Sequence, residues 1–331
     1  MVTYERPWEC VLLNAARDVN PFLFAYEALW LLAGRDDVAP LAYYCSKMPE
    51  FSDDGKTFNG SYGARWRNWR GTVGHSHMGV PLRGEIDQLQ IIIDHLQSKP
   101  DSRRAVLAMW NVEQDLLKID TSKDTCCNLD VVFSLREESE VVDTGGFAPW
   151  DEPISDVAKT KFLDTTVFNR SNDLVWGLTG ANAVQFAFLS SYVAGHLGVD
   201  VGIYNQVTCN AHAYLKTWEP ELWLSWDEDV RYQRDGIQPF PLIRDPETFD
   251  EELPQFVTNF SGQRFPAPTC YREPFLQNVA RPMLWAFRCY KDKEDASALG
   301  WLEKIEADDW RIAASGWIER RLAKRKEKVH G

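Results

Sequence analysis

Long apolar stretches in the sequence predict three helices of two kinds. Residues 21–33, PFLFAYEALWLLA, follow Asn20, whose side chain suits a helix N-cap, and stop at Gly34. Because they are apolar on every side, they predict a buried helix. Residues 180–197, GANAVQFAFLSSYVAGHL, predict the longest buried helix by the same criterion. Residues 84–98, GEIDQLQIIIDHLQS, predict an amphipathic helix with one side toward solvent.

Stretches rich in β-branched and aromatic residues predict strands between these helices. They are AVLAMW at 105–110, CNLDVVFSL at 127–135, FLDTTVFNRS at 162–171 and VDVGIYNQVTCNAHAYL at 199–215. Residues 50–61 are turn-rich, and residues 137–160 are polar, so both predict loops, the second as a surface insertion. Helical periodicity returns from about residue 290 and ends in a basic stretch, which we interpret as a solvated helix end. The whole pattern predicts an α+β fold with a mixed sheet and a few long buried helices.

Composition and charge narrow the class of protein. The 331 residues are 44% hydrophobic and 26% charged, an ordinary mix for a soluble globular protein. A formal charge of −13 argues against a nonspecific nucleic-acid binder, which needs a basic surface, so no direct nucleic-acid partner is expected. No run approaches roughly 18 apolar residues, and the N-terminal segment lacks the pattern of a secretory signal. We therefore expect a cytoplasmic protein without a membrane partner.

The cysteines indicate reduced thiols rather than a disulfide framework. There are seven, an odd number, and none forms a Cys-x-x-Cys pair. Cys126 and Cys127 are adjacent, and no second ligand pair has the spacing of a zinc finger, so no metal site is expected. Fourteen tryptophans are many for this length, and some of them can line a pocket for a planar ligand.

Cys127 is a candidate nucleophile because it opens a predicted strand, but a thiol reacts only if something lowers its pKa. Arg170, at the end of a later strand, could do so if it lay beside the sulfur. The alternative is that Cys127 is a small buried hydrophobe. The pair Arg103 and Arg104 offers two forked donors suited to a phosphate, although adjacent arginines are usually surface residues. The residues alone leave these alternatives open.

Six segments, in this order, resemble the thymidylate synthase family. They are EALWLLAG (27–34), GSYGARWRNW (60–69), SRRAVLAMWNV (102–112), CCN (126–128), RSNDLVWG (170–177) and NAHAYL (210–215). Any one segment is a weak signal, and six in the family's order are a strong one. The resemblance implies one thymidylate synthase-like domain over 1–331, with a recognisable core at 15–218, an insertion at 137–160 and an unassigned C-terminal extension at 219–331. It also implies a homodimer whose interface is formed by the sheet.

The resemblance assigns the chemical steps to four residues. Cys127 matches the nucleophile that adds to C6 of a pyrimidine nucleoside monophosphate, and Arg170 matches the arginine that contacts both thiolate and phosphate. Glu27 matches the glutamate that organises waters and proton transfers at the base, and Tyr62 lies in the motif whose tyrosine is near the reacting C5. The family's Pro-Cys-His is Cys-Cys-Asn here, so Cys126 is a competing nucleophile. We prefer Cys127 because Cys126 takes the proline position.

Further matches imply how the nucleotide is bound. Ser171 matches a phosphate ligand. Arg103 and Arg104 match the pair that each subunit of the homodimer donates to its partner's phosphate site. His212 and Tyr214 match the pair that binds the ribose hydroxyl. The resemblance therefore implies a phosphate site shared across the dimer interface.

The implied cofactor is 5,10-methylenetetrahydrofolate, and Asp173 matches the carboxylate that holds its pterin. Thiolate addition at C6 makes C5 nucleophilic enough to take up the methylene carbon. The exocyclic methylene that results becomes a methyl group with hydride and a hydroxymethyl group with water. The family covers this methylene and the cofactor with tryptophans, whose places hold Met48 and Phe51 here. Both are still apolar, but loss of the tryptophan at 48 favours water access, so we expect a hydroxymethylase, with a thymidylate synthase as the alternative.

The choice of base depends on one position. The family reads uracil with an asparagine four residues after the glycine that follows its Arg-Ser-x-Asp motif. Four residues after Gly177 stands Ala181, and Asn182 is one later. If a bulge around residues 179–180 shifts the register, Asn182 reads the base and dUMP is favoured. Without the bulge cytosine becomes plausible, so dCMP or CMP hydroxymethylation is an alternative, and the sugar stays open.

Proteins of other classes fit the sequence less well. A zinc-dependent nucleotide deaminase needs H-x-E and PCxxC motifs, and neither is present. A non-catalytic binding module predicts no covalent adduct with 5-fluoro-dUMP and methylenetetrahydrofolate, and a flavin-dependent methylase predicts a yellow protein.

One family feature is missing. Only 26 residues precede Glu27, too few for the arginine-bearing loop that closes over the phosphate, and Arg6 or Arg17 is a candidate to replace it.

Overall fold

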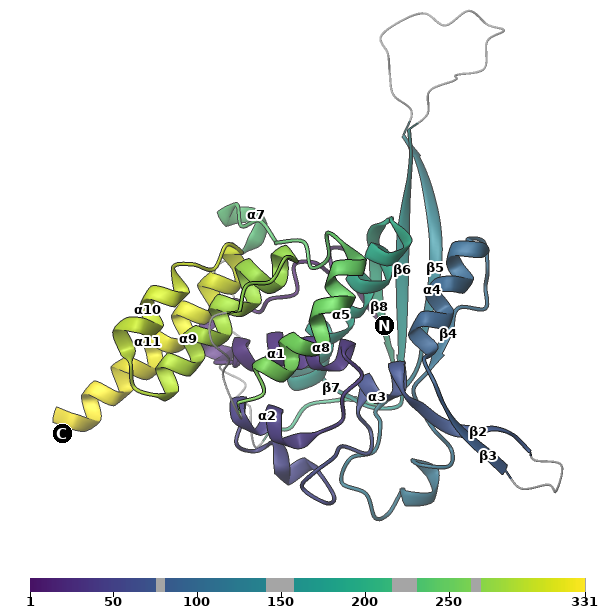
Figure 1. Ribbon diagram of the computed structural model, residues 1–331, viewed down its shortest axis with the longest axis horizontal. Helices are drawn as coiled ribbons and strands as arrows, with labels where there is room; N and C mark the ends of the chain where they lie inside the picture. The colour runs from purple at the N-terminus through teal and green to yellow at the C-terminus, as the bar shows by residue number, and fades with distance from the viewer. Residues whose placement is uncertain (76–80, 141–157, 216–230, 263–268, 331) are drawn as a thin grey trace, which may run out of the picture.

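A five-stranded mixed sheet lies at the centre of the protein (Figure 1). The computed structural model describes residues 1–75, 81–140, 158–215, 231–262 and 269–330. In order across the sheet, the strands are β1 (Val2–Tyr4), β8 (Asp200–Thr208), β6 (Ala158–Asn169), β5 (Asn128–Glu140) and β4 (Val106–Ala108). Neighbours are antiparallel except β6 and β8, which run parallel. The predicted mixed sheet is therefore confirmed.

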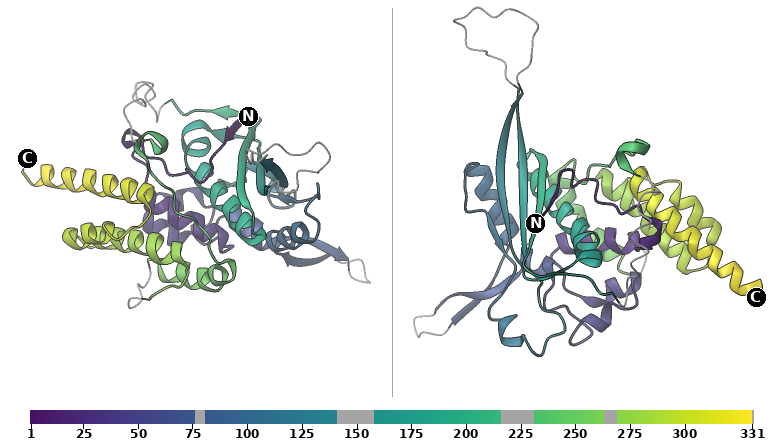
Figure 2. Two further views of the ribbon diagram at one scale, coloured as in Figure 1. Left: turned by 90° about the horizontal axis from the view of Figure 1, so that it is seen from above. Right: turned by 180° about the vertical axis from the view of Figure 1, so that it is seen from behind.

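Helices cover one face of this sheet (Figure 2). Those nearest to it are α1 (Pro21–Leu32), α3 (Tyr62–Arg67), α4 (Gln88–Ser98) and α5 (Ala181–Leu197). Along β6 the side chains alternate, so that Leu163 and Val167 are buried under α5 while Phe168 is exposed on the other face. Helix α1 packs on α5 and is in turn buried on nearly every side, as its continuous apolar sequence requires.

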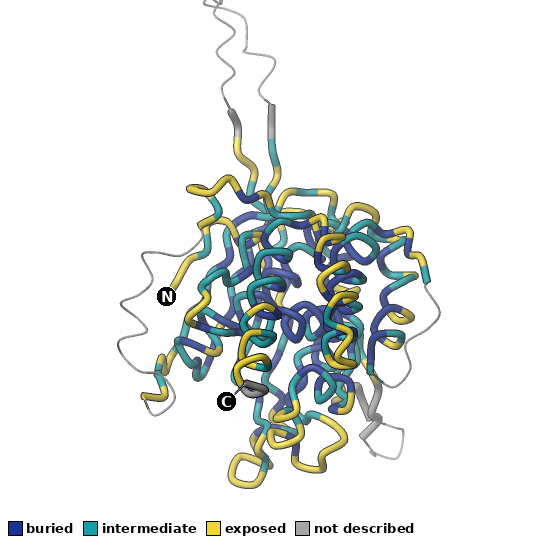
Figure 3. Tube along the Cα trace, turned by 90° about the vertical axis from the view of Figure 1, so that its left-hand side faces the viewer, coloured by how far each residue is buried: buried dark blue, intermediate teal, exposed yellow. Residues whose placement is uncertain are grey.

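The C-terminal helices lie on the side of α1 away from the sheet, and several of them pack directly against α1 (Figure 1). They are α7 (Tyr232–Asp235), α8 (Pro246–Asn259), η6 (Leu276–Ala280), α9 (Arg281–Lys291), α10 (Asp295–Leu302) and α11 (Asp308–His330). The ring of Phe22 in α1 lies 5.1 Å from that of Phe287 in α9 and 5.4 Å from that of Trp317 in α11. These contacts join the C-terminal helices to the sheet side through one buried apolar core (Figure 3).

Short elements complete the fold and bring distant segments together. They are α2 (Val38–Tyr44), β2 (Trp69–His75), β3 (Pro81–Ile86), β7 (Asn172–Asp173), β9 (Ala211–His212), η1 (Ala15–Arg17), η2 (Met48–Phe51), η3 (Leu116–Lys118) and the π-helical turn η4 (Leu174–Leu178). The β2–β3 hairpin projects from the body (Figure 1). The parallel pair of β7 and β9 continues beyond the ends of β6 and β8, and it sets residues 171–173 beside 210–212.

Both predicted buried helices are confirmed. The prediction over 21–33 corresponds to α1, where the Asn20 side chain accepts hydrogen bonds from the backbone N–H groups of Phe22 (3.1 Å) and Leu23 (3.2 Å). The prediction over 180–197 corresponds to α5. The amphipathic helix begins at Gln88 rather than at residue 84, because residues 84–86 pair in β3.

Two loop and strand boundaries were predicted wrongly. Residues 137–140 and 158–160 belong to β5 and β6, so the predicted surface loop over 137–160 is a strand at both ends, and residues 141–157 lie outside the described residues. The predicted strand over 199–215 stops at Thr208, and only Ala211–His212 pairs again, with β7. A hydrophobic pattern does not detect polar segments that extend a pair of strands, because backbone hydrogen bonds rather than burial stabilise them.

The described part of the chain holds no helix long and apolar enough to cross a membrane. No three His, Cys, Asp or Glu side chains within it are grouped so that they could hold a metal ion. All seven cysteines are free thiols.

Candidate active site

Cys127 and Arg170 meet because the strands beside them are paired. Asn128 begins β5 and lies opposite Asn169, the last residue of β6. The next residue on each side is therefore brought together, with Cys127 Sγ 3.8 Å from Arg170 Nη2. The guanidinium is held in place by backbone carbonyls, since its Nε donates to Cys126 O (2.9 Å) and its Nη2 to Thr125 O (3.0 Å). The structure thus places a cation beside the thiol, as the sequence suggested.

The environment of Cys127 acts on the thiol in two directions. Burial raises its pKa, the positive charge of Arg170 lowers it, and the carboxylate of Asp124 raises it. The balance leaves the pKa above the ordinary thiol value. Arg170 is thus the group that favours the reactive thiolate at this position.

Cys126, the competing thiol, faces the other way. It is buried, and its Sγ donates to the backbone carbonyl of Asn128 (3.3 Å). Burial raises its pKa to about 12, which leaves almost no thiolate near neutral pH. The Arg170 guanidinium contacts Cys126 through its backbone carbonyl, whereas it contacts Cys127 through the sulfur.

Glu27 and Tyr62 share the environment of Cys127. Glu27 lies on α1, and burial raises the pKa of its carboxyl to about 7, while a hydrogen bond with Gln185 of α5 lowers it. Tyr62 begins α3, and its ring lies 5.8 Å from that of Phe186. Burial raises the pKa of Tyr62 well above its ordinary value. The nearby Cys126, Cys127, Asp124 and Glu27 raise it further, in that order. Tyr62 is therefore a neutral hydroxyl that lies close enough to Cys127 and Glu27 to feel their charges.

The residues predicted to bind phosphate and ribose form a second group. Ser171 follows Arg170, and its hydroxyl lies 3.4 Å from His212 Nδ1 across the β7–β9 pair. The ring of Tyr214 lies edge-on to that of His212 at 5.1 Å, and Tyr214 is exposed. The side chains converge from two segments about 40 residues apart, because β7 and β9 run side by side.

Arg103 and Arg104 are exposed in the segment between α4 and β4. Among the residues that the structure describes, no hydrogen bond or ion pair joins either arginine to Arg170, Ser171 or His212. The described contacts of Arg104 are local: its backbone N–H donates to Ser102 Oγ (3.2 Å), and it lines a cavity with Gln88, His95 and Val106.

Asn182 lies at the start of α5 behind a widened helical turn. The turn η4 is π-helical, with Thr179 N donating to Leu174 O (3.2 Å), so it holds one more residue than an α-helical turn. Gly180 permits this path, since a Cβ there would lie 2.5 Å from Trp176 O. The extra residue lies slightly before the predicted bulge at 179–180. Asn182 is only 7% exposed, and its Nδ2 donates to Asn172 Oδ1 (3.2 Å).

Only one of the two carboxylate oxygens of Asp173 accepts hydrogen bonds from the described residues. Its Oδ1 caps η4, accepting from the backbone N–H groups of Val175 (3.0 Å) and Trp176 (2.5 Å). Its Oδ2 is buried and accepts no hydrogen bond from the residues described. A buried carboxylate oxygen without a donor suits the N–H groups of a pterin, so this residue fits the implied cofactor.

Comparison with known proteins identifies the family. The family model described as thymidylate synthase matches residues 10–225. The deoxyuridylate hydroxymethyltransferase of Pseudomonas phage M6 is 37% identical over 334 residues, which cover 97% of this chain and 83% of the relative. The chain belongs to the thymidylate synthase family. The deoxyuridylate hydroxymethyltransferase of Bacillus phage SP01 is also 37% identical, over 275 residues that cover 79% of this chain and 63% of that relative.

Met48 and Phe51, which stand where the thymidylate synthase family was expected to have tryptophans, differ in burial. Both lie on the short helix η2. Met48 is partly buried and packs against the apolar core, whereas Phe51 is 56% exposed. Phe51 therefore buries little surface within the chain, and Met48 is the better placed of the two to limit access to the interior.

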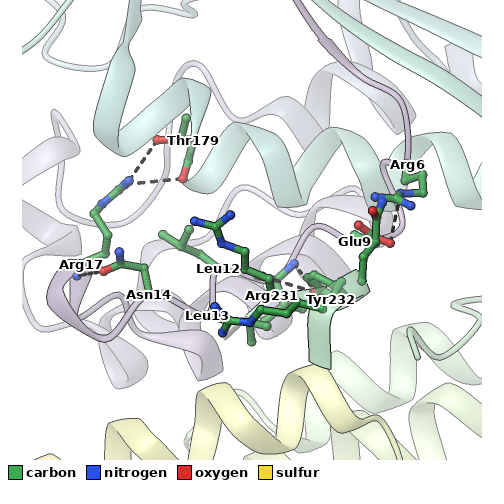
Figure 4. Close-up of a pocket in the computed structure, with 12 residues that line it drawn as sticks. Arg6, Glu9, Leu12, Leu13, Asn14, Arg17, Thr179, Arg231 and Tyr232 are labelled. Carbon is green, nitrogen blue, oxygen red and sulfur yellow. Dashed lines mark hydrogen bonds and ion pairs between the residues drawn. The ribbon is translucent and has the colours of Figure 1, made fainter. Parts of the chain in front are cut away.

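A cavity of about 790 Å³ adjoins η4 in this thymidylate synthase family member (Figure 4). Arg6, Arg17, Arg231 and Arg234 line it, together with Glu9. Arg17 Nη1 donates to Thr179 Oγ1 (3.1 Å), and its Nη2 donates to Val175 O (2.5 Å). Arg6 pairs with Glu9 (3.1 Å). Both candidates for the missing phosphate loop thus lie in this cavity, and the prevailing positive charge of its arginines favours an anion.

Sequence reasoning missed two polar residues of the site, Gln185 and Asn172. Gln185 contacts Glu27 from the middle of the largely apolar helix α5. Asn172 stands at the variable position of the family's Arg-Ser-x-Asp motif and binds Asn182. A signal for Gln185 was present, because a buried amide in an apolar helix needs a polar partner.

Proposed function

We propose that this protein transfers a one-carbon unit from 5,10-methylenetetrahydrofolate to C5 of dUMP and forms 5-hydroxymethyl-dUMP. The observation that carries the proposal is the Cys127 thiol held 3.8 Å from the Arg170 guanidinium. Membership of the thymidylate synthase family supports the reaction class, and two relatives named deoxyuridylate hydroxymethyltransferase support the substrate and product.

Cys127 acts as the nucleophile. Its thiolate adds to C6 of the pyrimidine, the electron pair moves toward O4, and C5 becomes nucleophilic. Arg170 stabilises the thiolate before addition, and with Ser171 it binds the 5′-phosphate, which fixes C6 over the sulfur. His212 and Tyr214 bind the ribose hydroxyl beside Ser171. The structure supports this arrangement by bringing both groups to the ends of β6 and β8.

Glu27 handles the protons. A carboxyl with a pKa of about 7 exists in both forms near neutral pH, so it can deliver a proton toward O4 and later accept one released from C5, through water. Gln185 orients this carboxyl, and Tyr62 supplies a neutral hydroxyl near C5.

Asp173 holds the cofactor. When bound, 5,10-methylenetetrahydrofolate supplies the one-carbon unit at the oxidation level of formaldehyde. The buried Oδ2 of Asp173 accepts from the pterin N–H groups, while its Oδ1 stays fixed by η4. Met48 and Phe51 contact the cofactor from η2.

The phosphate site is completed by a second copy of the chain. Arg103 and Arg104 are exposed and so accessible to a second copy of the chain, which supports their donation across a homodimer interface. The uncovered face of the sheet, which carries the exposed Phe168, is the proposed interface. The C-terminal helices share the buried core with α1, which supports one domain over 1–331.

Product analysis in isotopically labelled water tests the proposed function. Purified protein is incubated with dUMP and 5,10-methylenetetrahydrofolate, and the nucleotide product is weighed by mass spectrometry. The proposal expects a hydroxymethyl product that carries solvent oxygen. A methyl product, or no product from dUMP, would contradict it.

Met48→Trp is expected to lower the hydroxymethyl share of the product about twofold or more. The larger ring buries more apolar surface over the exocyclic methylene and so restricts water. Phe51→Trp is the comparison variant. The Phe51 side chain is largely exposed although it is assigned to the cofactor, so a larger ring there should change the product ratio less than Met48→Trp does. Chromatography of the methyl and hydroxymethyl nucleotides measures both variants. Equal ratios in the two variants would remove Met48 from control of water access.

A further inference from the structure

A row of hydrogen-bonded side chains leads from the partly buried Tyr4 in the N-terminal strand to the buried Asn182. Tyr4 in β1 donates its hydroxyl proton to the backbone carbonyl of Leu178. Gln206 in β8 donates from Nε2 to the Tyr4 hydroxyl oxygen (3.1 Å) and accepts at Oε1 from Asn172 Nδ2 (2.6 Å). Asn172 Oδ1 then accepts from Asn182 Nδ2 (3.2 Å). We call Tyr4, Gln206 and Asn172 the amide relay.

The hydrogen bond at the Tyr4 end of the amide relay determines the direction of all the others. A backbone carbonyl can only accept, so the single proton of Tyr4 is used on Leu178 O and its oxygen must accept from Gln206. Burial raises the pKa of Tyr4, which keeps that proton in place. The carbonyl oxygen of Gln206 must then face Asn172. The same logic turns Asn172 Oδ1 toward Asn182 Nδ2.

A second contact and a glycine support this assignment. Asn169 Nδ2 also donates to Gln206 Oε1 (3.4 Å), so two donors meet the same oxygen. Gly177 makes room for Asn172, because a Cβ on it would lie 1.9 Å from Asn172 Oδ1. The side chains of Asn169, Asn172 and Gln206 are all buried, where an amide turned the wrong way would leave two polar groups unsatisfied.

We propose that the amide relay makes the enzyme select uracil over cytosine by fixing which way round the Asn182 amide is held. With Nδ2 bound to Asn172, Asn182 Oδ1 and the second N–H of Nδ2 form the opposite edge of the amide. That edge accepts from N3–H and donates to O4 of uracil. Cytosine offers an acceptor at N3 and a donor at N4, so it meets like groups at both positions. Turning the amide over would reverse the preference. The inference rests on the proposed function, since it assumes that Asn182 faces the base.

Substitutions along the amide relay test it in the full-length protein. Asn172→Ala removes the acceptor that holds Asn182, and Tyr4→Phe removes the anchoring proton while keeping the ring stacked on Tyr204 (4.7 Å). Tyr44→Phe is the matched control, because Tyr44 also donates to a backbone carbonyl, that of Phe260 (2.7 Å), outside the relay. For each protein, kcat/KM and equilibrium Kd are measured with dUMP and with dCMP, and circular dichroism checks folding.

The parent and Tyr44→Phe are expected to prefer dUMP. Asn172→Ala is expected to reduce the dUMP:dCMP preference about tenfold or more, and Tyr4→Phe by a smaller factor, because a site loses selectivity once its polar groups can turn. A parental preference in Asn172→Ala or in Tyr4→Phe would overturn the relay while leaving the proposed function standing. A parent that forms no product from dUMP would instead overturn the proposed function. The Kd values show independently of turnover whether the variants still distinguish the two bases.

Discussion

Cys127→Ser is expected to lower kcat for dUMP by a factor of about 10⁴ or more. A serine hydroxyl keeps the size of the thiol but is far less acidic and a poorer nucleophile, so addition at C6 fails. The loss should fall on kcat, because the variant leaves Arg170 and Ser171, the proposed phosphate ligands, unchanged. Steady-state kinetics measures this. In a second measurement, 5-fluoro-dUMP with methylenetetrahydrofolate should form a covalent adduct with the parent and none with the variant, as read by intact-protein mass.

Cys126→Ser is the matched control for Cys127. Its hydroxyl can still donate to Asn128 O, and its side chain does not contact Arg170, so kcat should stay within about threefold of the parent. The covalent adduct should form as in the parent, and peptide mapping by mass spectrometry should place it on residue 127. A Cys127→Ser protein that turns over dUMP at the parental rate, or an adduct on residue 126, would contradict the assignment of the nucleophile.

The hydrophobic pattern was sufficient for the parts of the fold that are buried. Helix α1 is apolar except for Glu27 and has a side-chain cap at Asn20, so its position was predictable to within a residue. Strand ends and the β2–β3 hairpin were not predictable in this way. Residues 69–75 and 81–86 carry glycines, arginines and a proline, and only the backbone ladder between them makes them strands.

In the candidate site, too, some residue pairs were predictable from the sequence and others were not. Cys127 and Arg170 could be paired from the sequence because both flank predicted strands, and the family motifs name them. The amide relay could not, because Tyr4 and Gln206 are about 200 residues apart and meet only through the register of β1 on β8. The π-helical turn before Gly180 was likewise not predictable, although the proposed role of Asn182 at the base depends on the register that this turn sets.

Glu27→Gln is expected to lower kcat about 10²-fold to 10³-fold. The amide keeps the size of the side chain and its hydrogen bond to Gln185 but cannot transfer a proton toward O4 or accept one from C5. Because Glu27 is not among the proposed phosphate ligands, KM for dUMP should change much less than kcat. Glu27→Asp keeps a carboxyl and should retain part of the rate that Glu27→Gln loses, which separates a role in proton transfer from a merely structural one.

The pH dependence of the same pair gives a sharper test, because burial raises the pKa of Glu27 to about 7. If the protonated carboxyl delivers the proton to O4, the kcat/KM of the parent should fall as pH rises through about 7, and Glu27→Gln should lack that limb. Stability should change in the same window. A raised pKa in the folded state stabilises the fold fully below the ordinary value of 4.5, and this contribution is lost as pH rises through about 7. The free energy of unfolding of the parent, measured with urea against that of Glu27→Gln, should therefore decline over this range. A pH profile with the same limb near 7 in both proteins would assign the ionisation to another group.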